Sequence, residues 1–401
     1  MFHRPTRAMR RDLSQLLCAV AGLVLGLLFP LLAAGPQVDA GRVSTLLFTI
    51  GFGVVSLVSI IYSMLFLVVQ FSASTFTPRL GLFRDDPIVW RAFAFTVGVF
   101  VFCIVAGLRT GAHRQVSAFV AVAAMVLTLI ALALMRTLQM RAFSSIQLGH
   151  SLTAIATRAH RLFDALYVRP YDPGRVVRAH PAASGAGNAR TTAVRWSGPA
   201  TVLQQFDVPA LVRVAKEHDC SIAFRAAPGR SVSRGMELAG VTGGELPERV
   251  LREAVVTGVE RTFDQDPELP FRLLVDIALR ALSPAVNDPA TAVESLDRLE
   301  DLLARLADRE LDIGNFPDEE GRLRVTVPVP DWEQYVRTAV DELVFAAAGS
   351  PMALRRMRDL LGRLQERAPE DRCAVLRERL EWVERTGSGA FPLIWASREG
   401  G

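Results

Sequence analysis

Hydrophobic positions are distributed unevenly along the chain. Long apolar stretches fill the first third, and the remainder mixes apolar and polar positions as soluble proteins do. Each stretch has about 20 residues or more, enough at 1.5 Å rise per residue to cross a hydrocarbon core of about 30 Å. Because backbone polar groups in lipid must pair within the segment, these stretches should be helices. They cover Leu13–Leu32, Val43–Gln70, Ile88–Leu108 and Val116–Met135.

The same pattern divides the chain into five parts. After the fourth stretch, apolar and charged residues alternate at helical spacing, which predicts an amphipathic connecting helix. A β-rich module, a helical domain and a flexible tail follow. The fold class is thus a membrane domain of four transmembrane helices followed by a cytoplasmic α+β domain. The expected boundaries are 1–135, 136–168, 169–246, 247–386 and 387–401.

Alternation and turn residues define the β-rich module. Thr201–Phe206 and Cys220–Ala226 read as strands, and Asp207 can cap a short helix between them. Pro228-Gly229 and Arg234-Gly235 are turn signals. These hairpins resemble those of lipoyl- and biotinyl-type barrels, although no lysine is present for cofactor attachment. We therefore expect a small barrel-like module.

Helical spacing returns from Pro247 onward. Asp288 followed by Pro289 is typical of an N-cap with proline at the first helical position, and Asp266-Pro267 repeats the arrangement. Leu323–Val327 reads as a single strand. Two or three more helices are expected after it, including Trp332–Ala347 and Met352–Glu366.

Positive charge gathers around the apolar stretches. Residues 1–150 hold 12 arginines and four acidic residues, whereas residues 151–401 hold 33 basic and 37 acidic residues. Arginines before the first stretch, between the second and third, and after the fourth predict cytoplasmic N- and C-termini. We expect a multi-pass protein of the cytoplasmic membrane. A basic start and Ala33-Ala34-Gly35 also suit a secretory signal, but the long apolar core favours an uncleaved helix.

The composition disfavours several classes of protein. No basic stripe with interleaved aromatic residues appears, so nucleic acid is not an expected partner. The four cysteines form no C-x-x-C or Cys/His cluster, which argues against a zinc site or disulfide framework. No charge lies in the middle of an apolar stretch, which disfavours ion-coupled transport and leaves a passive pore open. Familiar catalytic motifs are absent, so catalytic residues remain unknown.

Small polar residues on the second apolar stretch form one candidate site. Ser56, Ser59 and Ser63 fall on one helical face at three- and four-residue spacing, with Gly51 and Gly53 above them. Such a face can line a pore. Close packing between helices is the structural alternative, because small residues are favoured at membrane helix contacts.

Oxygen-bearing side chains before and after one helix form a second candidate site. Carboxylate and amide oxygens suit Mg²⁺ or Ca²⁺, so a divalent cation is the cofactor that such a cluster would hold; none is otherwise evident. The structural alternative is that Asp266 and Asp288 cap helices and that Asp276 joins an ion-pair row. The candidates are Asp264, Asp266, Asp276, Asn287 and Asp288.

Four segments carry a family resemblance: Ser72–Leu80, Arg169–Asp172, Arg261–Pro267 and, most specifically, Leu274–Pro289. Together they resemble the bacterial membrane proteins grouped as domain of unknown function 2254. The resemblance covers roughly residues 10–365. It implies an integral membrane protein with a cytoplasmic domain and brings no activity. Pro270 departs from the small, flexible residue expected there.

These observations define the architecture more closely than the activity. We expect an oligomeric channel-like or sensory protein, regulated by its cytoplasmic domain, with the lipid bilayer and further copies of the chain as partners. A membrane-anchored enzyme that uses the Asp/Asn cluster with a divalent metal is one alternative. A membrane scaffold is another. Turnover, flux or a stable partner would separate the three.

Overall fold

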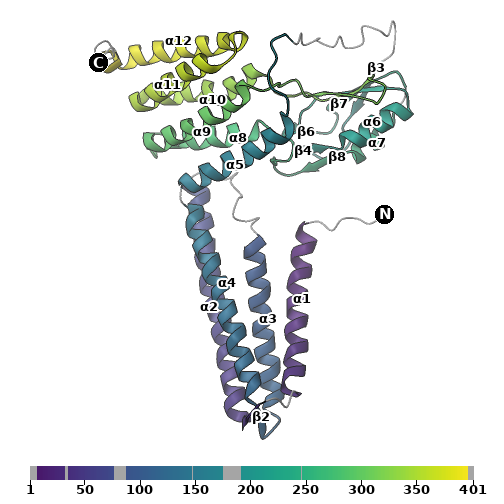
Figure 1. Ribbon diagram of the computed structural model, residues 1–401, viewed down its shortest axis with the longest axis vertical. Helices are drawn as coiled ribbons and strands as arrows, with labels where there is room; N and C mark the ends of the chain where they lie inside the picture. The colour runs from purple at the N-terminus through teal and green to yellow at the C-terminus, as the bar shows by residue number, and fades with distance from the viewer. Residues whose placement is uncertain are drawn as a thin grey trace. The chain divides into compact units, whose positions relative to one another are not determined.

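The structure is a computed structural model that describes residues 7–31, 35–75, 87–146, 148–174, 191–244 and 246–395. The chain divides into two compact units, Met1–His150 and Ser151–Gly401. We call them the membrane unit and the C-terminal unit, and each is described by itself (Figure 1). Parts of the predicted arginine clusters and of the Ser72–Leu80 segment lie outside the described residues.

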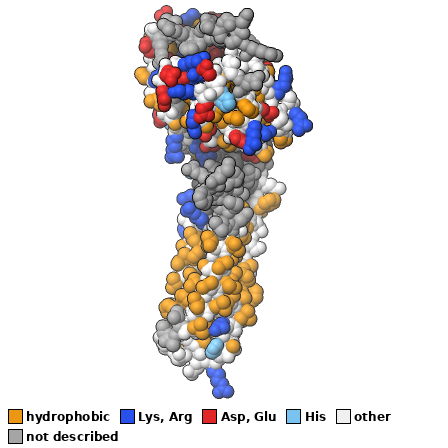
Figure 2. Space-filling view, turned by 90° about the vertical axis from the view of Figure 1, so that its right-hand side faces the viewer, with side chains coloured by type: hydrophobic (Ala, Val, Ile, Leu, Met, Phe, Trp, Pro, Cys, Tyr) orange, Lys and Arg blue, Asp and Glu red, His pale blue; other side chains and the backbone are white. Residues whose placement is uncertain are grey.

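Four long helices build the membrane unit, as the apolar stretches predict. Each is long and apolar enough to cross a membrane. Large apolar side chains such as Leu17, Phe52 and Leu129 are exposed on its surface, where lipid would solvate them. Figure 2 shows hydrophobic side chains covering this part of the chain. The helices are α1 (Arg7–Leu28), α2 (Ala40–Thr75), α3 (Pro87–Thr110) and α4 (Ala118–Ile146).

Helix α3 packs against each of the other three helices of the membrane unit. Glycines allow α1 to approach it closely. A Cβ added to Gly22 would lie 2.2 Å from the carbonyl oxygen of Gly98, and one added to Gly98 would lie 2.8 Å from that of Cys18. Lipid supplies no hydrophobic force between helices, so this close backbone contact is what dispersion attraction requires.

A short sheet joins two loops of the membrane unit. Strand β1 (Gln37–Asp39) pairs antiparallel with β2 (Gln115–Ser117). Asp39 accepts a hydrogen bond from the backbone N–H of Arg42 at 2.9 Å, which satisfies an early donor of α2. The pairing fixes the start of α2 beside the start of α4.

Two separate sheets form the β-rich part of the C-terminal unit. The five-stranded sheet has the order β3-β7-β5-β10-β9, and the three-stranded sheet the order β6-β4-β8. Only β5 and β10 pair in parallel among these strands. Their bounds are β3 (Thr191–Arg195), β4 (Thr201–Phe206), β5 (Ser221–Phe224), β6 (Ser231–Val232), β7 (Glu237–Thr242), β8 (Val255–Gly258), β9 (Asn315–Pro317) and β10 (Leu323–Thr326).

The expected barrel-like module is therefore wrong. A barrel requires its first and last strands to pair, whereas each of these sheets keeps two edge strands. The predicted turns do form, since Gly229 and Gly235 adopt φ values of 87° and 86°. They connect β5 to β6 and β6 to β7, so the chain passes from one sheet to the other and back instead of closing a hairpin.

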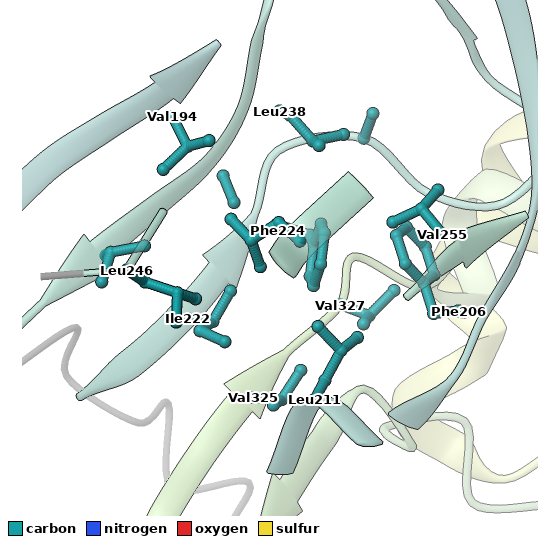
Figure 3. Close-up of a cluster of buried hydrophobic side chains, with 14 of the residues drawn as sticks. Val194, Phe206, Leu211, Ile222, Phe224, Leu238, Leu246, Val255, Val325 and Val327 are labelled. Carbon is teal, nitrogen blue, oxygen red and sulfur yellow. The ribbon is translucent and has the colours of Figure 1, made fainter. Parts of the chain in front are cut away.

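One apolar core fills the β-rich part. Leu203 of β4 is buried in it. Phe206 of β4, Ile222 and Phe224 of β5 and Val325 of β10 are buried in the same core (Figure 3). Helices α6 (Val208–Glu217) and α7 (Glu248–Glu253) contribute further apolar side chains. As predicted, Asp207 caps α6 and accepts a hydrogen bond from the backbone N–H of Ala210 at 3.1 Å.

Helices complete the C-terminal unit, including the two expected after Trp332. Most of α5 belongs to this unit. Salt bridges join several neighbouring helices; Glu300 of α9, for example, accepts from Arg363 of α11 at 2.7 Å. The helices are α5 (Leu148–Leu166), α8 (Leu269–Ala281), α9 (Pro289–Ala307), α10 (Trp332–Ala346), α11 (Pro351–Arg367), α12 (Cys373–Ala390) and α13 (Pro392–Trp395).

Aromatic residues dock α5 within this unit. Phe163 stacks on Phe271 of α8 with ring centroids 6.1 Å apart. Tyr167, directly after α5, shares a hydrogen bond of 2.5 Å with Tyr335 of α10, and both tyrosines are fully buried. Burial raises the pKa of Tyr167 and of Tyr335, because a phenolate would lack solvation there.

Arg372 connects the end of α9 to the start of α12. Its buried guanidinium donates to the carbonyl oxygens of Leu306, Ala307 and Arg309 at 2.8–2.9 Å. It also lies 4.2 Å from the ring centroid of Tyr171. These carbonyls belong to the last turn of α9 and the residues after it, where partners within the helix are lacking.

The last described residues are also anchored. Trp395 is buried, and a Cβ added to Gly387 would lie 2.3 Å from its ring. Its indole N–H donates to Glu384 at 2.5 Å, and Arg358 lies 4.8 Å from the ring centroid. Residues 387–395 of the segment expected to be flexible are thus mostly helical, and residues 396–401 lie outside the described residues.

Candidate functional sites

The three candidate serines of α2 share an exposed face of the membrane unit. Ser56, Ser59 and Ser63 are all exposed. Gly53 is open, since an added Cβ would meet no atom within 4 Å. Gly51 instead faces α3, and its added Cβ would lie 3.2 Å from that of Cys103. Within one chain, therefore, the serine face does not serve helix packing, whereas Gly51 does.

Two further hydroxyls extend this face. Thr45 and Thr49 of α2 are exposed as well. At 100° per residue, the five positions fall within an arc of about 80°. From Thr45 to Ser63 they extend over about 27 Å, close to the thickness of a hydrocarbon core. We call Thr45, Thr49, Ser56, Ser59 and Ser63 the hydroxyl face. The sequence signal for the two threonines was their helical spacing from the three serines.

Three hydroxyls of this face direct their protons back toward the helix. Thr45, Thr49 and Ser63 each donate to the carbonyl oxygen four residues earlier, at 2.8–2.9 Å. The oxygen lone pairs are left to face outward. In contrast, Thr96 and Thr110 of α3 are buried and satisfied inside the unit. The hydroxyl face therefore presents partial negative charge along an otherwise apolar surface.

Asp266, a member of the second candidate site, forms an ion pair with Arg261. Its carboxylate is buried and accepts from Nε and Nη2 of Arg261 at 2.6 and 2.8 Å. It also accepts from the backbone N–H of Leu269 at 3.2 Å, although α8 begins only at that residue. Gly229 makes room, since its added Cβ would lie 2.1 Å from Oδ2 of Asp266. Burial raises the pKa of Asp266, and the bonds from Arg261 oppose this shift.

The remaining candidates have separate surroundings. Asp276 accepts from Arg272 at 2.8 Å, as the four-residue spacing suggests. Asp288 caps α9 and accepts from the backbone N–H of Thr291 at 3.2 Å, as predicted. Asn287 is exposed with φ at 48°, and Asp264 is exposed.

No metal cluster is found within the described part of the chain, where no three His, Cys, Asp or Glu side chains are grouped to hold an ion. Three of the candidate carboxylates already bond to arginine or to a helix N-terminus. The contacts of these carboxylates therefore support a structural role, which is to hold the helix ends in place. The hydrogen bonds from Thr291 lower the pKa of Asp288, so this cap stays ionised at neutral pH.

Comparison with known proteins supplies the family. A family described as "Predicted membrane protein (DUF2254)" matches residues 13–363. The chain belongs to this family. Two curated relatives are the uncharacterized proteins Rv1290c of Mycobacterium tuberculosis and Mb1321c of Mycobacterium bovis. Each is 29% identical over 359 residues, which span 84% of this chain and 67% of the relative. No solved structure matches the chain.

Membership of the DUF2254 family agrees with the four apolar helices and makes this a predicted membrane protein. The relatives' names state no activity. Both candidate sites lie within the matched residues, whereas Arg372 and Trp395 lie beyond them. The family therefore supports the membrane setting of α2 and leaves function to be argued from the side chains.

Proposed function

We propose that this DUF2254 protein is a homo-oligomeric, channel-like membrane protein in which the hydroxyl face of each copy lines a central passage. The observation that supports the proposal is the exposure of five hydroxyl side chains on one face of α2. Exposed positions on either side of this face, such as Val55 and Ile60, are apolar as a lipid contact requires, and the exposed Phe52 interrupts the face between Thr49 and Ser56. A polar face of membrane length is better matched by water or by another protein than by lipid.

The chemistry of the face favours cations or water over anions. Because Thr45, Thr49 and Ser63 donate their protons to helix carbonyls, these three hydroxyls offer oxygen lone pairs to a permeant species. Oxygen rings of this kind replace part of a cation's hydration shell. No carboxylate is present on the face to bind an ion tightly, which suits passage better than storage.

The membrane orientation is also a proposal. Arginine is concentrated before α1, between α2 and α3 and after α4, which favours cytoplasmic N- and C-termini. The C-terminal unit is then on the cytoplasmic side and regulates the passage. Helix α5 transmits this regulation to the membrane helices, since it begins two residues after α4 ends.

The proposal is tested by mass and by flux. Native mass spectrometry of the full chain in lipid nanodiscs gives the stoichiometry, and cation flux into proteoliposomes gives the activity. The triple variant Ser56→Leu, Ser59→Leu, Ser63→Leu should reduce flux at least tenfold, because apolar constrictions exclude water. Thr137→Leu is the matched control, since it removes an exposed hydroxyl from α4, where Thr137 donates to Ala133.

Two results would overturn the proposal. The first is a monomer or dimer, which has too few helices to enclose a central passage. The second is a flux that the triple variant and Thr137→Leu lower equally. A ring of four or more copies with selective loss in the triple variant supports it.

A further inference from the structure

One end of the helical array in the C-terminal unit is defined by side-chain contacts. Glu268, just before α8, accepts from Gln334 near the start of α10 at 3.2 Å, and Arg272, one turn later, contacts Glu342 near the end of α10 at 2.5 Å, so these two helices run in the same direction. Arg356, near the start of α11, contacts Asp297 of α9 at 2.6 Å. The starts of α9 and α11 therefore lie at the end where α8 and α10 finish. Helix α12 runs back along α11 and finishes there too.

Large apolar side chains are exposed at this end. Phe345 closes α10 and is 72% exposed, although its ring meets Trp382 at 4.9 Å. Met352 begins α11 and is 55% exposed. We call the set the apolar tip; it comprises Val286, Phe345, Met352, Leu393 and Ile394. Exposed large apolar residues on the α8–α9 connection, at the end of α10, at the start of α11 and on α13 indicate a contact surface.

The chain enters the C-terminal unit at the same end. Thr153, near the start of α5, accepts from Arg298 in the first half of α9 at 3.3 Å. His160 and Asp164 follow in register with Asp301 and Arg305, so α5 runs in the same direction as α9. The candidate membrane span of α4 ends at Arg141, 12 residues before Thr153. A chain of that length spans at most about 40 Å when fully extended.

We propose that the apolar tip inserts into the headgroup layer of the bilayer. The short path from Arg141 keeps this end of the C-terminal unit within reach of the lipid surface, and a covalent tether makes even a small apolar contact effective. Exposed charges of both signs lie on α9, α11 and α12, including Arg355, Arg385, Glu294 and Glu381. Contact is therefore carried by apolar insertion and is the same on zwitterionic and anionic lipid.

Depth-dependent fluorescence tests the inference on the full chain in nanodiscs. An environment-sensitive fluorescent amino acid replaces Phe345 or Met352, and lipids spin-labelled in the headgroup region serve as quenchers. Phosphatidylcholine discs are compared with discs that contain phosphatidylserine. The matched control carries the same probe at Met236, which is 41% exposed on the turn between β6 and β7.

Quenching several-fold stronger at positions 345 and 352 than at 236, equal in both lipids, is the expected result. Equal quenching at all three positions would overturn the inference. Protection from an aqueous quencher without lipid quenching would also overturn it, because a second copy would then cover the tip. Val286→Asp with Leu393→Asp should reduce the lipid quenching while far-UV circular dichroism stays unchanged. The result does not depend on the proposed channel, since a monomer carries the same tip.

Discussion

The two units of this protein pack their helices by different means. In the membrane unit, α1 and α3 meet through glycine, and hydroxyls such as Ser44 bond across to a helix carbonyl. In the C-terminal unit, arginine joins helix to helix, as Arg356 and Arg363 do at Glu300. The same chain thus uses small side chains in one region and long charged ones in the other.

The difference follows from the solvent that each unit displaces. In lipid, apolar burial supplies little force, so helices gain by approaching closely. In water, burial drives association, and charged side chains at the margins orient the helices and cover apolar surface with their stems. Perturbations should therefore be local to one unit and characteristic of its packing.

Arg372→Ala should have the largest effect, because it should destabilise the folded C-terminal unit. It removes the donor to the carbonyls of Leu306, Ala307 and Arg309 at the end of α9. Leu306 also accepts from the backbone N–H of Arg309, whereas the other two carbonyls would lose their partner at about 1–3 kcal/mol each. We expect a loss of about 3–5 kcal/mol in the free energy of unfolding, read by chemical denaturation of this unit. Arg377→Ala, at an exposed position of α12, is the control. Equal stability of the two variants would contradict the assignment.

Gly22→Val should instead destabilise the helix packing of the membrane unit. The added Cβ would lie 2.2 Å from the carbonyl oxygen of Gly98, so α1 must move away from α3. Overpacking of this kind costs about 1–3 kcal/mol, measurable as a lower melting temperature in detergent. Leu23→Val changes an exposed neighbour and should have little effect. If Gly22→Val altered hydrogen exchange in the C-terminal unit more than in α1, the independence of the units would be disproved.

Local features of both units could be predicted from the sequence. The four helices followed from apolar length, and the caps at Asp207 and Asp288 from residue type before a helical pattern. The division of β5, β6 and β7 between two sheets could not, because pairing depends on partners distant in sequence. The pairing of Arg261 with Asp266 could not be predicted either, although the two residues are only five positions apart. It also requires the space beside Gly229, which is distant in sequence. Which face of α2 is exposed depends on where α3 packs.

A smaller effect should come from Asp288, whose cap makes the stability of the C-terminal unit depend on pH. Its pKa is lowered, so its contribution to stability is complete above its ordinary pKa of 3.8 and is lost as the pH falls through the lowered value. Asp288→Ala should cost about 1 kcal/mol at neutral pH. Asp288→Asn keeps the cap but cannot titrate, so stability should fall less steeply in acid. The exposed Asp264→Asn is the control, and equal acid slopes for both asparagine variants would contradict the prediction.

The smallest expected effect concerns divalent cations. Asp266, Asp276 and Asp288 already have partners, so Mg²⁺ or Ca²⁺ should leave the melting temperature of the full chain unchanged. Differential scanning fluorimetry with and without each ion measures this. A rise in melting temperature that Asp264→Ala with Asp276→Ala abolishes would instead support a metal site and a metal-dependent enzyme.

The hydrogen bond between Tyr167 and Tyr335 gives this protein an intrinsic optical probe. The chain has four tyrosines, and burial raises the pKa of these two. During an alkaline titration, the phenolate absorbance of Tyr167 and Tyr335 should therefore be absent while they are buried. It should appear when Tyr167 separates from α10. Because Tyr167 follows α5 directly, the absorbance would report detachment of that helix without any label.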